Sequence, residues 1–507
     1  MDEPACSNKG CALKLNPVTR SQGILLCAQL GRLVLYVAVA ALLGRRLAPE
    51  DFGFVALVTS IYIVTIEILD LGTAAVAIRE IAARPDRERD TLAALLALRR
   101  LVAALVFVVM MGLTFSNFVE HRDQRFVLVG VACGLFLLHL HAYQLVFQIR
   151  QTYGRLSVLG LTSQLGFLLL SLAALRLHAG GAVIALLVVI REIVQVLATR
   201  WLALRILGEP LRARWLPAAM WPLLKSGWMI GMAGVCYKLS TYSGGFMLWE
   251  MAAPEALASF SAAQRLLVPM ADMAWLFVTP LIASLGVAAA RDLATYRLQV
   301  ESYAKLLLGM SSLVAVAGYS CAPLVLRLLY GEQYASGPWS AVGAFRWLAL
   351  ACLFALVTPL LAVGETSQGR ARPLLFTGLA CLGLNLAGNL WAIPRYGGEG
   401  AAMVLCACEA FVLLALLTRC IRRGEARVDP TWAAYLAPAA GLGLAMWALR
   451  EFPLTQMLVC CAWLPAALLV MTRFPAQRAR RASLAAASSQ WGPQPGAVTP
   501  ATPADSR

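Results

Sequence analysis

Long runs of hydrophobic residues recur along the whole chain, and short polar segments separate them. A helix needs about 20 mostly apolar residues to cross a lipid bilayer. The runs predict fourteen membrane-spanning helices, at residues 22–44, 54–78, 92–115, 126–148, 157–177, 181–206, 226–249, 256–286, 302–328, 339–363, 372–392, 400–420, 432–449 and 455–472. No polar segment between them is long enough to fold as a soluble domain, which argues against many membrane enzymes.

The composition agrees with a membrane protein, because 60% of the 507 residues are hydrophobic and only 14% are charged. The formal net charge of +16 does not indicate nucleic-acid binding, because it lies mainly on one set of short loops. With the N-terminus in the cytoplasm, 30 of the 43 Lys and Arg residues fall on the inner side and 8 on the outer side. The positive-inside rule therefore predicts that both termini are cytoplasmic.

Five basic residues remain within the apolar runs, namely Arg32, Arg191, Lys238, Arg265 and Arg346. A charge at the centre of a membrane helix costs roughly 2.5–3.5 kcal/mol on insertion scales, so such residues face the bundle interior, a partner or water. Converging on one cavity, they would bind an anion, and pyrophosphate suits the forked hydrogen bonds of Arg. Tyr36 and Tyr242 lie one helical turn beyond Arg32 and Lys238 and join the predicted substrate site.

Plainer interpretations of these cations remain open. Arg265 and Asp272 share a helix face and could form a structural pair, and Arg191 and Glu192 could neutralise each other. Arg346 lies near the start of its helix and could extend its charge to the membrane surface.

The acidic residues within spans are candidates for carrying a coupled proton, because burial favours the neutral carboxyl group. They are Glu67, Asp70, Glu192, Asp272 and Glu409, of which we select Asp70, Asp272 and Glu409. A salt bridge or a position at a helix end is the alternative for each. The Glu50–Asp51 pair is expected to begin a helix rather than to act in catalysis.

Metal and cofactor signals are missing from the sequence. The 13 cysteines show no metal-ligand spacing, and most lie within apolar runs, where they act as small packing residues. No phosphate-binding loop and no HExxH motif occur. We therefore expect no metal, no cofactor and no enzymatic activity.

An internal repeat is suggested by Arg32-x-x-x-Tyr36 in the first span and Lys238-x-x-x-Tyr242 in the seventh, although a chance match remains open. Two related six-helix units are common in transporters. The predicted organisation is listed by residue number: 1–20, a cytoplasmic tail; 21–206, an N-lobe of helices 1–6; 207–225, a cytoplasmic linker; 226–420, a C-lobe of helices 7–12; 431–473, helices 13 and 14; and 474–507, a disordered cytoplasmic tail.

Several segments resemble the flippases of lipid-linked oligosaccharides, the Wzx-like polysaccharide exporters of the multidrug/oligosaccharidyl-lipid/polysaccharide superfamily. The segments are LGRRLAPEDFG at 43–53, DLGTAAVAIREIA at 70–82, APEALASFSAAQRL at 253–266, YGEQYASG at 330–337 and LNLAGNLWAIPRYGGEGAA at 384–402. Their order and spacing fit over roughly residues 20–420, whereas the region after 430 follows no strong pattern.

The resemblance implies an all-α polytopic membrane protein in the bacterial inner membrane. Two pseudo-symmetric six-helix lobes would surround a central cationic cavity, with two further helices at the C-terminus. It also implies the substrate, an oligosaccharide on undecaprenyl pyrophosphate, and alternating access as the mechanism. Membrane lipid and a polysaccharide polymerase or export complex are the partners it suggests. A drug or metabolite exporter of the same superfamily, or a membrane glycosyltransferase or polymerase, are the alternatives.

Overall fold

The computed structural model describes residues 17–115, 122–150, 152–278, 292–337, 339–427 and 429–449, with scattered positions at 281–289 and 455–467. All regular elements in these ranges are helices, which confirms the all-α expectation. They are α1 (Pro17–Arg46), α2 (Pro49–Asp70), α3 (Thr73–Ala83), η1 (Pro85–Arg87), α4 (Glu88–Phe115), α5 (Arg122–Leu137), η2 (Leu138–Tyr143), α6 (Gln144–Ile149), α7 (Tyr153–Arg176), α8 (Gly181–Leu207), α9 (Pro217–Met251), α10 (Pro254–Val278), α12 (Leu293–Tyr330), α13 (Glu332–Ala335), α14 (Val342–Ala355), α15 (Thr358–Ser367), α16 (Ala371–Arg422) and α17 (Thr431–Ala448).

Nine segments among the described residues are long and apolar enough to cross a membrane, so the predicted count of fourteen is not confirmed. Two predicted spans, 372–392 and 400–420, correspond to the two parts of α16, which a kink with non-helical backbone angles at Gly397 separates. The helices α9 and α10 are not among the nine, because Lys238 and the serines and glycines of α9, and Gln264, Arg265 and Asp272 of α10, lower their hydropathy. The fourteenth predicted span lies largely outside the described residues.

Helix boundaries follow local signals in the sequence. The helix α2 begins with Pro49, whose missing amide hydrogen is tolerated in the first turn. Glu50 and Asp51 follow in that turn and favour the positive end of the helix dipole, which fits their predicted role in starting a helix. The helix α2 ends where Leu71 and Gly72 both adopt left-handed backbone conformations, so that α3 starts in a new direction.

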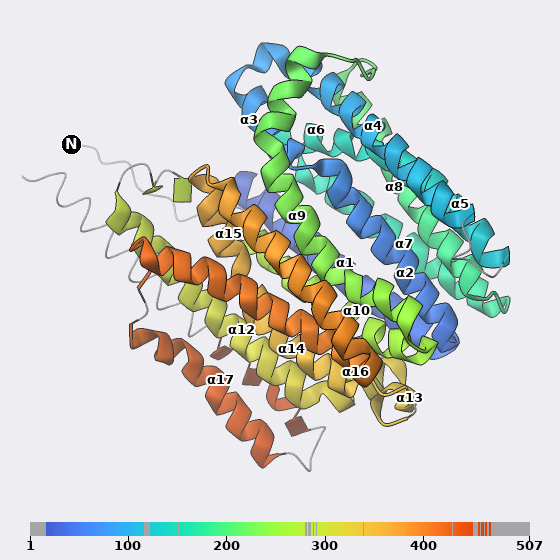
Figure 1. Cartoon of the computed structure of the whole chain (residues 1–507), viewed down its shortest axis with the longest axis vertical. Coiled ribbons are helices and arrows are strands. Elements are labelled where there is room, and N and C mark those ends of the chain that lie inside the picture. Colours follow the sequence, from blue (N-terminus) through green and yellow to red (C-terminus); the bar gives the residue numbers. More distant parts are fainter. Residues whose placement is uncertain are drawn as a thin grey trace, which may run out of the picture.

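The helices form two groups, with α9 between them (Figure 1). We use N-lobe for residues 21–206 and C-lobe for residues 226–420. The helices α2, α4, α5, α7 and α8 lie on one side, and α12, α14, α15, α16 and α17 lie on the other. The helix α9 packs against α16 and also against α2, α3 and α4 of the N-lobe. The largest buried hydrophobic cluster also includes residues of both lobes.

The lobes meet firmly at the end of the bundle where α1 finishes, which we call the Arg45 end. The Nε atom of Arg45 donates a hydrogen bond of 2.8 Å to the carbonyl oxygen of Leu329, and its Nη2 atom donates to that of Leu328. These carbonyls lie in the last turn of α12, where backbone acceptors lack helical partners. The Nε2 atom of Gln333 donates to the carbonyl of Gly44 at 3.3 Å. The N-lobe is thus joined to the C-lobe at this end.

A second contact between the lobes lies nearer the opposite end, which we call the Arg84 end, and it depends on glycines. The turn at Leu71 and Gly72 lies against Gly227 and Gly231 of α9. A Cβ atom on Gly227 would lie 3.1 Å from the carbonyl carbon of Gly72, and one on Gly231 would overlap the carbonyl group of Leu71. Small residues at such spacing let helix backbones approach closely within membranes.

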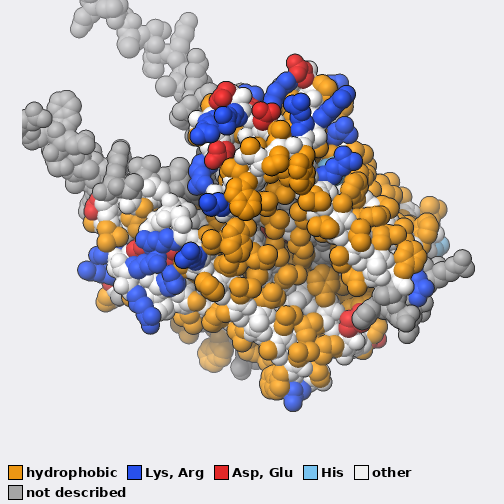
Figure 2. All heavy atoms as spheres, turned by 45° about the horizontal axis from the view of Figure 1, so that its top comes forward, with side chains coloured by type: hydrophobic (Ala, Val, Ile, Leu, Met, Phe, Trp, Pro, Cys, Tyr) orange, Lys and Arg blue, Asp and Glu red, His pale blue; other side chains and the backbone are white. Residues whose placement is uncertain are grey.

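The surface is divided into an apolar flank and a charged end, as in proteins that span a membrane (Figure 2). Figure 2 shows hydrophobic side chains over the flank of the bundle and Lys and Arg side chains gathered toward the Arg84 end. Exposed basic residues there include Arg84, Arg87, Arg89, Arg212 and Arg214. The protein is a multi-pass membrane protein, with its apolar flank in contact with lipid.

Candidate functional site

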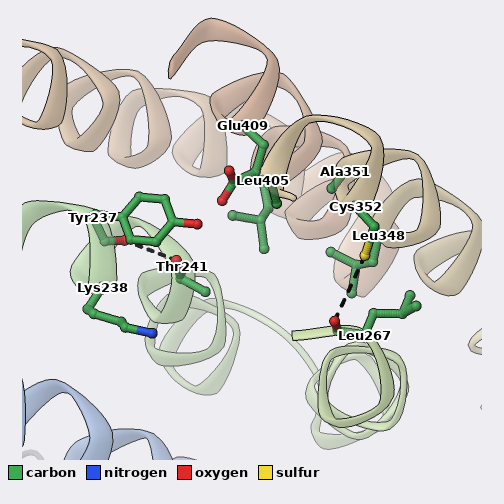
Figure 3. Close-up of a pocket in the computed structure, with 10 residues that line it drawn as sticks. Tyr237, Lys238, Thr241, Leu267, Leu348, Ala351, Cys352, Leu405 and Glu409 are labelled. Carbon is green, nitrogen blue, oxygen red and sulfur yellow. Dashed lines mark hydrogen bonds between the residues drawn. The ribbon is translucent and has the colours of Figure 1, made fainter. Parts of the chain in front are cut away.

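Lys238 lines a partly open cavity in the C-lobe, between α9, α10, α14 and α16 (Figure 3). The other lining residues are Tyr237, Thr241, Leu267, Leu348, Ala351, Cys352, Ala355, Leu405 and Glu409. The cavity has room for only roughly one or two water molecules. It could therefore receive phosphate oxygens at its edge but not a sugar, so a large substrate would have to lie outside it, between the lobes.

The polar groups of this cavity come from two helices. Tyr237, Lys238 and Thr241 belong to α9, and Glu409 is a buried residue of α16. In Figure 3 the ring of Tyr237 extends toward Glu409, whereas Lys238 points away from that carboxyl group. The structure thus brings the predicted substrate cation Lys238 and the predicted proton carrier Glu409 to one cavity. Tyr242 is buried in the helix packing and does not line this cavity.

Arg265 lies in a different place, within an aromatic cluster at the Arg45 end. Its guanidinium lies 4.9 Å from the ring centre of Phe52, on α2 of the N-lobe. Tyr330 and Tyr334 pack against the same ring, at 6.0 and 6.2 Å. Among the described residues, its buried Nη2 atom has no hydrogen-bond partner. Arg265 therefore joins the lobes where they are closed, and the side chain of its suggested partner Asp272 lies outside the described residues.

Two further predicted cations have local partners. Arg191 forms an ion pair with Glu192 and donates to the Oε1 atom of Gln164 at 3.1 Å, an arrangement expected from local neutralisation. Arg346 stacks on the ring of Tyr319 at 5.1 Å and lies in the first turns of α14. Neither contact involves Lys238 or Arg265, so the described residues do not gather the five cations at a single point.

Arg32 and Tyr36 lie on α1 of the N-lobe. Arg32 is exposed, and a Cβ atom on Gly160 of α7 would lie 3.8 Å from its side chain. Tyr36 is half-buried, and its phenol group lies near that of Tyr330. Tyr36 thus faces the contact between the lobes, while Arg32 lies along its own lobe.

Arg99 is a buried cation near the start of the predicted span 92–115, where the positive-inside count places it with the basic residues of the inner side. It is 4% exposed, and its Nη2 atom donates to the Oδ1 atom of Asp70. Lys305 was assigned in the same way and is also buried, with its Nζ atom 3.1 Å from Asp429. The bundle interior therefore contains Arg99 and Lys305 in addition to cations among the five that the sequence predicts, so the expected number of five was too low.

A sequence signal could have located both residues. Arg99 and Lys305 are 206 residues apart, as are Arg32 and Lys238, and Tyr36 and Tyr242. The structure places Arg99 on the third long helix of the N-lobe and Lys305 on the third of the C-lobe. The internal repeat therefore extends beyond the first helix of each lobe.

The ion pair of Asp70 and Arg99 predicts a folding role for Asp70, whether or not Asp70 also carries a proton. Replacing Asp70 by Asn should leave Arg99 buried without its counter-charge, which costs about 3–5 kcal/mol. We expect a marked loss of folded protein, measured by detergent-solubilised yield and thermal unfolding. The double variant Asp70→Asn, Arg99→Met should recover much of the yield, because the buried charge is removed. If Asp70→Asn folds normally, this role is wrong.

The chain is similar to a known protein family and to several solved structures. A family model described as "Polysaccharide biosynthesis protein" matches residues 18–284. The solved structure "Lipid II flippase MurJ, inward closed conformation" has 11% sequence identity and a TM-score of 0.70, covering 89% of this chain and 98% of that one. An inward-facing multidrug resistance MATE transporter has 14% sequence identity and a TM-score of 0.59, and the match covers 79% of this chain and 98% of that one.

The eukaryotic MATE transporter AtDTX14 has 12% identity and a TM-score of 0.53, covering 83% of this chain and 98% of its own. No curated protein sequence matches the chain. At these identities the solved structures show a shared fold and nothing finer.

Proposed function

The chain belongs to the polysaccharide biosynthesis protein family, and from this we propose that it is a flippase for oligosaccharides linked to undecaprenyl pyrophosphate. It would move the lipid-linked repeat unit across the bacterial inner membrane, for surface or exported polysaccharide, by alternating access and without covalent chemistry. The observation that carries the proposal is Lys238, a cation at membrane depth that lines a cavity beside the contact between the lobes. Such residues mark substrate paths in membrane proteins.

The ligand is proposed from the charge of the site. A pyrophosphate group is a strong hydrogen-bond acceptor, and Lys and Arg are its usual partners. Lys238 in the C-lobe and Arg32 in the N-lobe are the proposed partners, with Arg265 reached when the Arg45 end opens. The small cavity would take phosphate oxygens, the sugars would lie between the lobes, and the lipid tail would remain in the bilayer.

The orientation is proposed from the distribution of basic residues. The exposed arginines at the Arg84 end would face the cytoplasm, together with both termini. The Arg45 end, where the lobes are joined by Arg45 and the aromatic cluster, would face the periplasm. The structure would then represent a form closed to the periplasm, in which the lobes also meet at Gly227 and Gly231 nearer the cytoplasmic end.

An exporter of drugs or metabolites is the second candidate, because the fold also resembles MATE transporters. Glu409 in the cavity is the feature that favours it, since a buried acid suits a cationic compound. A glycosyltransferase or polymerase would need a substantial domain outside the membrane, and no loop of this chain is long enough for one. A polymerase or export complex could still be a partner.

Deletion of the gene tests the proposed function directly. We expect the polysaccharide to disappear and its lipid-linked repeat unit to accumulate in the cytoplasmic leaflet, where a periplasmic glycosidase cannot reach it. The measurement is thin-layer chromatography of labelled lipid extracts before and after glycosidase treatment of spheroplasts. The native gene should restore export. Intact polysaccharide together with new sensitivity to cationic dyes would favour the drug exporter and contradict the flippase.

A further inference from the structure

One face of α9 combines three glycines with Lys238. Gly227, Gly231, Gly234 and Lys238 follow one another at intervals of four, three and four residues. These intervals place all four on one side of a helix, because 3.6 residues make a turn. The glycines leave this face flat, and Lys238 is the first large side chain on it.

The N-lobe helix α2 covers this flat face. Its end packs on Gly227 and Gly231 through Leu71 and Gly72, and Glu67 packs one turn further along. A Cβ atom on Gly234 would lie 2.5 Å from the Oε1 atom of Glu67. Gly234 therefore leaves room for a carboxyl group of the N-lobe to lie directly against the C-lobe helix.

Lys238 is the next residue on that face, about 6 Å further along the helix axis. The four-carbon stem of a lysine can span such a distance. In Figure 3 the side chain of Lys238 does not extend toward Glu409 as that of Tyr237 does. The packing of α2 on α9 therefore places Lys238 one helical turn beyond the carboxyl group of Glu67.

Two other charged groups of the N-lobe, Arg99 and Asp70, lie beside Glu67. Arg99 of α4 lies near enough to interact with the charge of Glu67, but its hydrogen bond goes to Asp70. Asp70 and Arg99 offset each other, and Lys238 is the cation that lies one turn further along the facing helix from the position of Glu67. In a membrane interior, the low dielectric constant makes an interaction between Glu67 and Lys238 strong.

We propose that Glu67 is the counter-charge of Lys238, which the substrate pyrophosphate must displace in order to bind. Glu67 competes with the pyrophosphate for one cation, so it lowers the affinity for substrate and speeds its release. This inference rests on the proposed flippase function. A repeat in the sequence accompanies it, since Ala-Pro-Glu begins both α2 and α10, and Glu67 and Asp272 each lie 17 residues after that glutamate.

The test is binding of undecaprenyl pyrophosphate without sugars to the full-length protein in lipid nanodiscs. Glu67→Gln removes the charge at nearly constant shape and should tighten binding at least about fivefold, the lower range of coupling between sites. Export of polysaccharide by the same variant should fall, because release slows. Glu67→Asp, which keeps the charge, should bind as the native protein does. Glu209→Gln, at an exposed acid, is the matched control and should change nothing.

The pH dependence provides a readout that a merely structural residue would not alter. Protonation of Glu67 should mimic Glu67→Gln, so native affinity should rise more steeply than that of the variant as pH falls. Among the described residues, Arg99 lies near enough to interact with the charge of Glu67, Asp70 is the ion-pair partner of Arg99, and Lys238 is the proposed partner; all three are unchanged in the variant.

Each outcome separates this inference from the function on which it rests. If the native protein does not bind the lipid, both fail. If it binds but Glu67→Gln binds equally or more weakly with the same pH profile, Glu67 is not the counter-charge and the flippase proposal stands. Should Glu67→Gln fail to fold, Glu67→Met removes the charge with an apolar chain of similar length, and the same tightening is required of it.

Discussion

Replacing Lys238 by Ala is expected to abolish polysaccharide export while leaving the amount of folded protein near normal. A hydrogen bond to a charged group contributes about 1.5–3 kcal/mol, so losing this partner should weaken pyrophosphate binding about 10- to 100-fold. The side chain lies at the edge of a cavity, and Glu67 can take up a proton once its counter-charge is gone, so the removal of Lys238 should leave the helix packing intact. Binding of undecaprenyl pyrophosphate in nanodiscs and export in cells are the two measurements.

Two controls sharpen this prediction. Lys238→Arg keeps the charge and should retain part of the export, and Lys225→Ala removes an exposed lysine from the same helix and should have no effect. The double variant Arg32→Ala, Lys238→Ala should bind no better than either single variant. Normal export by that double variant would rule out the proposed pyrophosphate site, although the family membership would remain.

Replacing Gly231 by Ala is expected to reduce export severely through the contact between the lobes. The new Cβ atom would overlap the carbonyl group of Leu71, which is backbone and cannot rotate away. Overpacking costs typically about 1–3 kcal/mol, and a clash with backbone belongs at the upper end of that range. The turn at Leu71 and Gly72 must then move off α9, which should lower the thermal unfolding temperature in detergent and open the lobes at this position.

Gly245→Ala is the matched control for this variant. Gly245 lies on the same helix, and a Cβ atom there would meet only the Leu257 side chain, at 3.9 Å. That substitution should leave unfolding temperature and export unchanged. Equal behaviour of Gly231→Ala and Gly245→Ala would show that the close approach of α2 and α9 is not required.

Hydropathy predicted most of the helices that the described residues form. The predicted break between 372–392 and 400–420 agrees with the structure, because Gly397 has non-helical backbone angles and divides α16 at a kink. The helices α9 and α10 were predicted from the sequence, although their polar residues remove them from the nine most apolar segments. These polar residues face the interior of the bundle and the contact between the lobes, so average hydropathy understates how such helices fit a membrane protein.

The sequence by itself determined that this protein is a helical membrane protein, because burial in lipid requires long apolar runs whatever their neighbours are. It also identified Lys238 and Arg265 as unusual, because the cost of a charge in hydrocarbon depends only on its position in a run. Only the tertiary structure decided what each charge meets. Asp70 faces Arg99, Arg265 faces Phe52, and Glu67 faces α9, because helix packing sets these pairs across distances in sequence that no local pattern records.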